Sequence, residues 1–170
     1  RVERLRHAPH IAPVAALRWL QVEILWKSLV GRVDGLLDDA QEALRLAQLP
    51  GLERARPFTL LAAAHAAWVA GDTARALGHI EVARTLIQPT RLYERSILEF
   101  LTGVIALREG DPVIGVRKLQ GAAQLARDAG CPGRERVARF ALCLAHTEAG
   151  DLEPAQAALI AARSDPSYGV

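Results

Sequence analysis

The residues best able to do chemistry in this chain are its histidines and cysteines, but their spacing matches no catalytic or metal-binding pattern. His7 and His10 are close together, yet they lie among prolines near one end and lack the further ligands of a zinc site. Cys131 lies in a predicted turn without a neighbouring histidine to activate its thiol. Cys143 falls at a small-residue packing position, where we expect a core side chain. The sequence therefore predicts no catalytic residue, metal or cofactor.

Other function classes are excluded by motif and composition. The phosphate-binding pattern Gly-x-x-x-x-Gly-Lys and the metalloprotease pattern His-Glu-x-x-His are both absent. A balance of 21 basic and 19 acidic residues does not favour a nucleic-acid surface. No long apolar run is free of charges, so no membrane span is expected. Two cysteines are too few for a disulfide framework, which favours a reducing compartment, the cytoplasm.

The chain carries a long internal repeat, which determines how its elements are arranged. Gly31, Gly71, Gly110 and Gly150 lie at intervals of 40, 39 and 40 residues, and Asp follows the last three. A period of this size is typical of stacked helical hairpins. Glycine can end one helix in the left-handed conformation, and aspartate can cap the next. After Gly31, where Arg follows, we expect Asp34 to be the cap.

The resulting prediction is an all-α array of about four antiparallel helix pairs. We expect helices over 14–30, 34–47, 57–70, 73–87, 92–109, 112–128, 134–149 and 152–163. The repeats would cover 14–49, 55–90, 91–130 and 133–166 of a single domain over 14–166. Residues 1–13 would be a tail or the end of a preceding element. The chain lacks an initiating Met, which suggests a piece of a longer protein.

Small residues recur at fixed positions and predict close helix crossings. Ala43, Ala83, Ala122 and Ala162 each lie twelve residues after a hairpin glycine. Ala64, Gly103 and Cys143 each lie seven residues before one. Large side chains at such crossings would overpack the hairpins.

With these positions, the chain resembles the tetratricopeptide repeat family. Taking each hairpin glycine as position 15, small residues fall at the family's positions 8, 20 and 27 over nearly the whole chain. The period is longer than the family's usual 34 residues, and it is similar to that of the helical sensor domains in maltose-activator-type bacterial transcription regulators. The resemblance implies a right-handed superhelical solenoid whose groove holds a protein, a peptide or a small effector.

The resemblance also implies which side chains line that groove. Carried over from the family, the positions are Phe58, Leu61, His65, Trp68, Ile97, Phe100, Val104, Leu107, Arg108, Val137, Phe140 and Leu144. An apolar face with a few polar groups suits an amphipathic helix, an apolar peptide or a small effector. The alternative is that these side chains are simply core. We expect Arg134, Glu135, Arg136 and Arg139 to form a solvated charged face.

The first predicted helix is apolar nearly all the way round, unlike a terminal helix with one polar face. Either a repeat precedes it, or it docks on a partner; Trp19 and Trp26 could then mediate homo-oligomer formation. The leading hypothesis is a non-enzymatic, protein-binding or effector-sensing domain of a bacterial signalling or transcription regulator. The alternatives are a constitutive scaffold or oligomerisation module, and an accessory domain of an enzyme whose catalytic part lies elsewhere.

Overall fold

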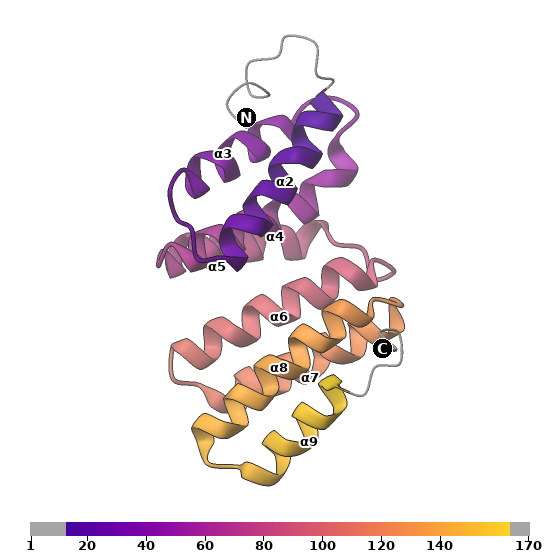
Figure 1. Cartoon of the computed structure of the whole chain (residues 1–170). Coiled ribbons are helices and arrows are strands. Elements are labelled where there is room, and N and C mark those ends of the chain that lie inside the picture. Colours follow the sequence, from indigo (N-terminus) through magenta and orange to yellow (C-terminus); the bar gives the residue numbers. More distant parts are fainter. Residues whose placement is uncertain (1–12, 164–170) are drawn as a thin grey trace. The chain divides into compact units, whose positions relative to one another are not determined.

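The computed structural model describes residues 13–163, and all the regular structure in that range is helical (Figure 1). The all-α prediction is therefore confirmed for this part of the chain. In order, the elements are α2 (Pro13–Leu29), α3 (Leu36–Leu46), η1 (Glu53–Ala55), α4 (Arg56–Val69), α5 (Thr73–Leu86), α6 (Leu92–Arg108), α7 (Pro112–Asp128), α8 (Pro132–Ala149) and α9 (Leu152–Arg163). Each α-helix ends within two residues of its predicted limits, and η1 is an unpredicted 3-10 turn.

The hairpin glycines end their helices as expected. Gly31, Gly71, Gly110 and Gly150 have φ of 69°, 86°, 85° and 81°, in the left-handed region that favours glycine. The amide of the next residue donates to a carbonyl five residues earlier, as from Asp72 N to Ala67 O at 2.8 Å. Bonds of this Schellman type satisfy carbonyl groups at the helix end that have no partner within the helix. Gly130 makes the same turn between α7 and α8, so the device also joins successive hairpins.

Two of the aspartates after these glycines, Asp72 and Asp111, have a second role at the start of the following helix. The Asp72 carboxylate accepts from Arg75 N at 3.0 Å, and the Asp111 carboxylate accepts from Ile114 N at 2.9 Å. Both bonds cap orphan amides of the first turn. The cap predicted at Asp34 is wrong. Helix α3 is preceded by Gly35, which has a φ of 65° and makes no side-chain cap. The longer turn from Gly31 places Asp34 one residue too early.

The chain divides into two compact units, one ending at Leu86 and the other beginning at Ile87. In the N-terminal unit, α2 packs on α3 and α4, α3 packs on α4, and α4 packs on α5. Its core is built from buried leucine and alanine side chains with Ile24. Two polar contacts cross this core. Lys27 Nζ donates to Asp39 Oδ2 at 2.5 Å, and Gln21 Nε2 donates to Thr59 Oγ1 at 2.9 Å. These bonds tie α2 to α3 and to α4.

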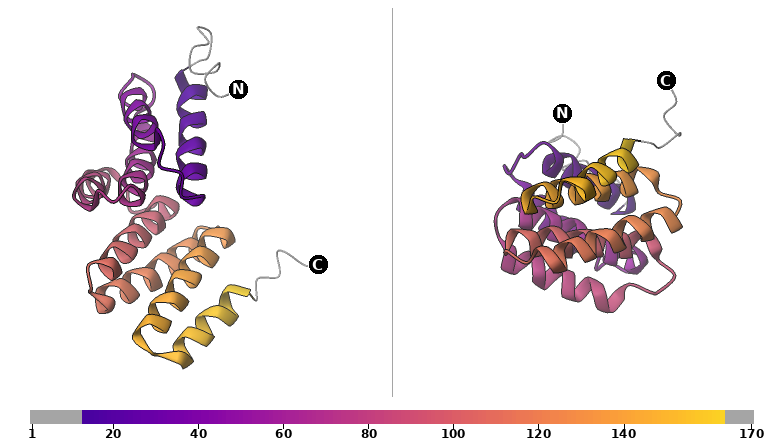
Figure 2. Two further views of the ribbon diagram at one scale, coloured as in Figure 1. Left: turned by 60° about the vertical axis from the view of Figure 1, so that its left-hand side comes forward. Right: turned by 90° about the horizontal axis from the view of Figure 1, so that it is seen from below.

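In the C-terminal unit, α6, α7, α8 and α9 pack in chain order, each against the next (Figure 2). The closest approach is between α6 and α7, where Gly103 faces Gly115. A Cβ added at Gly115 would meet Leu107 Cδ2 at 2.5 Å, and one at Gly103 would meet Leu119 Cγ at 2.9 Å. Glycine at both positions allows these two helices to lie this close.

The recurring small residues lie where the repeat predicts. Ala43, Ala83, Ala122 and Ala162 are all buried, as is Ala64 on α4. Cys143, expected in the core, is only half-buried. Its predicted role as a core side chain is therefore only partly met, because α8 is covered less completely than α4.

Candidate binding face

The predicted groove residues of the N-terminal unit lie on α4 and are only partly accessible. Leu61 is fully buried, so it belongs to the interior and not to a ligand-contacting surface. Phe58, His65 and Trp68 are half-buried. The rings of His65 and Trp68 stack with centroids 5.9 Å apart and planes 20° apart. The structure thus places His65 beside Trp68, as the sequence predicts, and the two rings form a stacked pair.

On α6 the predicted positions become more accessible along the helix. Ile97 is buried and, like Leu61, contributes to the interior. Phe100, Val104 and Leu107 are half-buried, and Arg108 is exposed. Phe100 also packs against the core cluster formed by Ala122, Ala123 and Ala138. Burial at Leu61 and Ile97 follows from close packing of the helices around small residues, which leaves these larger side chains inside.

The predicted positions on α8 form the most exposed apolar group of the set. Val137, Phe140 and Leu144 are between 41% and 65% exposed. Their spacing of three and four residues places them on one side of the helix. We call these three residues the α8 face. Exposed apolar groups of this kind mark interaction surfaces more often than chance positions do.

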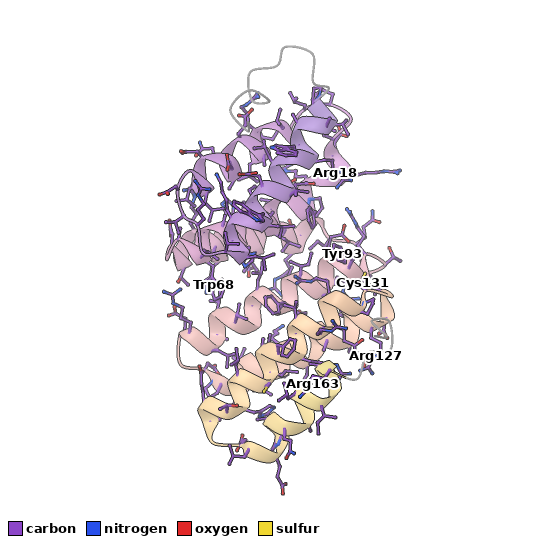
Figure 3. All side chains as sticks on the ribbon, viewed as in Figure 1. Arg18, Trp68, Tyr93, Arg127, Cys131 and Arg163 are labelled. Carbon is purple, nitrogen blue, oxygen red and sulfur yellow. The ribbon has the colours of Figure 1, made fainter. Side chains whose placement is uncertain are left out.

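Arg134 lies one turn before Val137 and links the α8 face to α6. Its guanidinium carbon is 5.1 Å from the centre of the Phe100 ring, a cation–π geometry. Burial lowers the pKa of the Arg134 guanidinium, while Tyr93 and Cys131 act in the opposite direction. Tyr93 and Cys131 lie at the same end of this unit (Figure 3). The buried Nε atom of Arg134 has no hydrogen-bond partner among the described residues.

The expectation of a solvated charged face at the start of α8 is therefore wrong. Arg134, Glu135, Arg136 and Arg139 are all partly buried. Glu135 accepts from both Arg127 and Arg139, at 2.8 and 2.6 Å. Burial alone would raise the pKa of Glu135, but these two guanidinium groups outweigh it and hold the pKa below its ordinary value. Arg134 does not take part in this ion-pair network, and it lies at the end of the α8 face.

The first described helix, α2, carries a second exposed apolar surface. Trp19 and Trp26, predicted as a docking face, are both exposed, together with Val22 and Leu29. The opposite side of the same helix is packed into the core. This surface belongs to the N-terminal unit and is separate from the α8 face.

The described residues hold no cluster of three or more His, Cys, Asp or Glu side chains suited to a metal ion. Cys131 and Cys143 are free thiols. The His7–His10 pair lies outside the described residues. No helix in residues 13–163 is long and apolar enough to cross a membrane. Among the described side chains, the two apolar surfaces and Arg134 are candidates for recognition.

Comparison with known proteins adds no assignment: no family model matches the chain, and no curated protein matches it either. The likeness to tetratricopeptide repeats rests on the repeat positions and turns described above.

Arg134 is not among the side chains predicted to line the groove. The signal was available in its spacing, because Arg134 lies three residues before Val137 on the same side of the helix. Because charged residues surround Arg134 in the sequence, it is grouped with them in the prediction of a solvated face. Arg134 differs from Arg136 and Arg139 because its guanidinium packs on the ring of Phe100 from another helix.

Proposed function

We propose that this chain is a non-enzymatic, tetratricopeptide-like protein-binding domain that holds an amphipathic helix of a partner protein against the α8 face. The observation that carries the proposal is the exposed apolar group Val137, Phe140 and Leu144 with Arg134 at its end. An amphipathic helix presents apolar side chains at the same spacing of three and four residues, so the two surfaces are complementary.

The exposure of these side chains favours a protein partner over a small effector. Pockets for small molecules enclose most of their ligand's surface and are lined by side chains that curve around it. Val137, Phe140 and Leu144 instead remain 41–65% exposed. A partner of extended shape can cover such a row, whereas an effector would touch one or two of its members. Phe140 is the best candidate for a central anchor, because aromatic side chains dominate binding energies.

Arg134 supplies the polar requirement of the partner. A guanidinium that is partly desolvated gains most from an anionic group, and it can hold a carboxylate through two hydrogen bonds. The partner helix should therefore carry Asp or Glu about one turn away from its apolar residues. An uncharged partner would leave the Arg134 charge without compensation when the face is covered.

The wider setting proposed here is a cytoplasmic bacterial signalling or transcription regulator. The support is the repeat period, which resembles that of the sensor domains of maltose-activator-type regulators. In that setting the helix pairs continue as a right-handed superhelical solenoid. In that setting the α8 face would be the recognition surface of the domain.

A designed peptide tests this function. The probe is a fluorescein-labelled helical peptide with Leu at positions i, i+3 and i+7 and one Glu a turn away; its control has the same composition in scrambled order. We expect saturable binding of the probe in fluorescence anisotropy and weak binding of the scrambled peptide. Phe140→Ala should weaken binding by about 30-fold, corresponding to about 2 kcal/mol for a central aromatic anchor.

Val113→Ala is the matched control, since Val113 is 77% exposed on α7 of the same unit but lies outside the α8 face. We expect it to leave the affinity unchanged. Equal binding of both peptides, or an unchanged affinity in Phe140→Ala and Leu144→Ala, would show that the α8 face is not the binding surface.

A further inference from the structure

Helix α2 presents apolar side chains on two opposite sides. Leu17, Leu20 and Ile24 are packed in the core of the N-terminal unit. On the other side, Trp19, Val22, Trp26 and Leu29 are between 43% and 78% exposed. We call these four residues the α2 stripe. A helix at the surface of a monomer normally carries one apolar side, so the stripe requires an explanation of its own.

The spacing of the stripe is that of a coiled-coil seam. Trp19, Val22, Trp26 and Leu29 alternate by three and four residues, as the a and d positions of a heptad do. Ala15 continues the same series toward the start of the helix and is also exposed. A seam with this spacing fits another helix that carries apolar residues in the same pattern.

We propose that two copies of this chain associate through their α2 stripes, with the two α2 helices parallel. A second copy offers the same pattern of apolar residues, and the contact closes by two-fold symmetry. The copies then cover each other's tryptophans, and no further surface of either chain is needed.

The charges that flank the stripe support a second copy and fix its direction. Arg18 precedes Trp19 on one side of the seam, and Glu23 follows Val22 on the other. In a parallel pair, residues at these two flanking positions meet across the interface. Arg18 of each copy then lies opposite Glu23 of the other, which makes two pairs of opposite charge. In an antiparallel pair like flanking positions meet, so Arg18 would not lie opposite Glu23 and neither ion pair would form.

The present contacts of Arg18 and Glu23 are weak enough to be exchanged when the two copies pair. Arg18 donates to Gln21 Oε1 at 3.2 Å and is exposed to solvent. Glu23 lies 3.8 Å from Lys27 Nζ, a longer distance than the 2.5 Å from Lys27 to Asp39. Lys27 is therefore held mainly by Asp39. The Glu23 side chain is 14% exposed, so its carboxylate must turn outward from Lys27 to meet Arg18 of the second copy.

The size of the stripe predicts reversible association. Two half-exposed tryptophans and two aliphatic side chains supply on the order of 500 Å² per copy, below the roughly 800 Å² of a standard interface. We therefore expect a dimer that forms in the micromolar range and dissociates on dilution.

Sedimentation velocity of the chain between about 1 and about 100 µM tests the association. We expect a shift from monomer to dimer over this range. Trp26→Glu places like charges against each other at the centre of the seam and should weaken the dimer at least 10-fold. Leu77→Glu is the control, because Leu77 is a similarly exposed apolar residue on α5 of the same unit. It should leave the association unchanged, and circular dichroism should show equal helix content in all three proteins.

A cysteine at Leu29 tests the direction. In a parallel pair the two copies of this position face each other, so Leu29→Cys should form a covalent dimer under mild oxidation. The parent chain, which keeps Cys131 and Cys143, is the control and should not. In an antiparallel pair a positions face d positions, so Leu29 would face Trp19, and cross-linking would instead require mixing Leu29→Cys with Trp19→Cys.

Three results would overturn the proposal. The first is a monomer at every concentration, the second is a dimer that survives in Trp26→Glu, and the third is cross-linking only in the mixture with Trp19→Cys. None of them bears on the α8 face, because the peptide assay uses variants in α8 and can be run at concentrations where the chain is monomeric.

Discussion

The position eight residues after each hairpin glycine carries an ionisable side chain in three of four hairpins, namely Asp39, His79 and Lys118, with Ala158 in the fourth. In two hairpins this side chain reaches the preceding helix. Asp39 accepts from Lys27 at 2.5 Å, and Lys118 Nζ lies 3.0 Å from Glu99. The same register therefore holds an anion in one repeat and a cation in another, and both of the chain's lysines join the two helices of a hairpin.

His79 makes folding depend on pH. Burial lowers the pKa of His79 from its ordinary value of 6.5, Arg75 lowers it further, and Asp72 partly opposes them. The unfolded chain therefore takes up a proton at a higher pH than the folded chain does. Stability contributed by neutral His79 is fully present above about pH 6.5 and is lost as the pH falls toward the folded-state pKa.

The measurement is the midpoint of urea unfolding across that pH range. In His79→Gln we expect a smaller loss of stability between about pH 7.5 and about pH 5.5 than in the parent chain. The comparison with the parent removes the effects of the other histidines, which both proteins share. If the two proteins lose the same stability over this range, His79 is not a source of the pH dependence.

The buried ion pair of Lys27 and Asp39 should be costly to break from one side. Asp39 is 1% exposed, so Lys27→Met would leave a carboxylate without its closest cation in the core. We expect a loss of about 3–5 kcal/mol in the free energy of unfolding. Lys118→Met is the control, because Lys118 and Glu99 are each about a quarter exposed and water reaches both groups, so it should lose less stability than Lys27→Met.

Chemical denaturation of both variants provides the comparison. The double variant Lys27→Met with Asp39→Leu removes both charges and should recover much of the lost stability. Equal losses in Lys27→Met and Lys118→Met would mean that burial does not set the strength of these pairs.

At the scale of the elements, the hairpin between α6 and α7 depends on two glycines at one crossing. Alanine at Gly115 would place Cβ 2.5 Å from two atoms of Leu107, and the backbone oxygen of Gly103 would lie at 3.2 Å. Overpacking of this kind costs about 1–3 kcal/mol, which exceeds the gain of up to about 1 kcal/mol from replacing a helical glycine. We therefore expect Gly115→Ala to lower the melting temperature.

Gly78→Ala is the matched control within α5. Nothing lies within 4 Å of a Cβ added there, so only the helix preference acts, and the variant should be more stable than the parent by up to about 1 kcal/mol. Should both variants melt above the parent protein, the close approach of α6 and α7 at Gly115 would be refuted.

The helices could be predicted from the sequence because the signals that start and end them are local. Glycine in the left-handed region and aspartate at the next position act within a few residues, and both signals recur with one period. The cap at Asp34 could not be predicted, because the first turn departs from that pattern. The position of Arg134 beside the α8 face could not be predicted for a different reason. Its environment is set by Phe100 on α6, a residue far away in sequence, and no local rule reports that contact.

At the scale of the whole molecule, each of the two units carries an exposed apolar surface to which a proposal assigns a role. The α2 stripe lies on the N-terminal unit, and the α8 face lies on the C-terminal unit. Their flanking charges differ. Arg18 and Glu23 provide both signs and suit a second copy, whereas Arg134 provides a cation and suits an acidic partner. The proposals therefore assign self-association to one unit and recognition to the other.

The most direct test of the central claim is to locate the bound peptide on the chain. Amide chemical shifts of the ¹⁵N-labelled protein are recorded while the amphipathic peptide of the anisotropy assay is added. We expect the shifts to concentrate in α8 between Arg134 and Leu144 and around Phe100 of α6. Shifts confined to α2 or α5, or spread evenly along the chain, would contradict a recognition surface on α8.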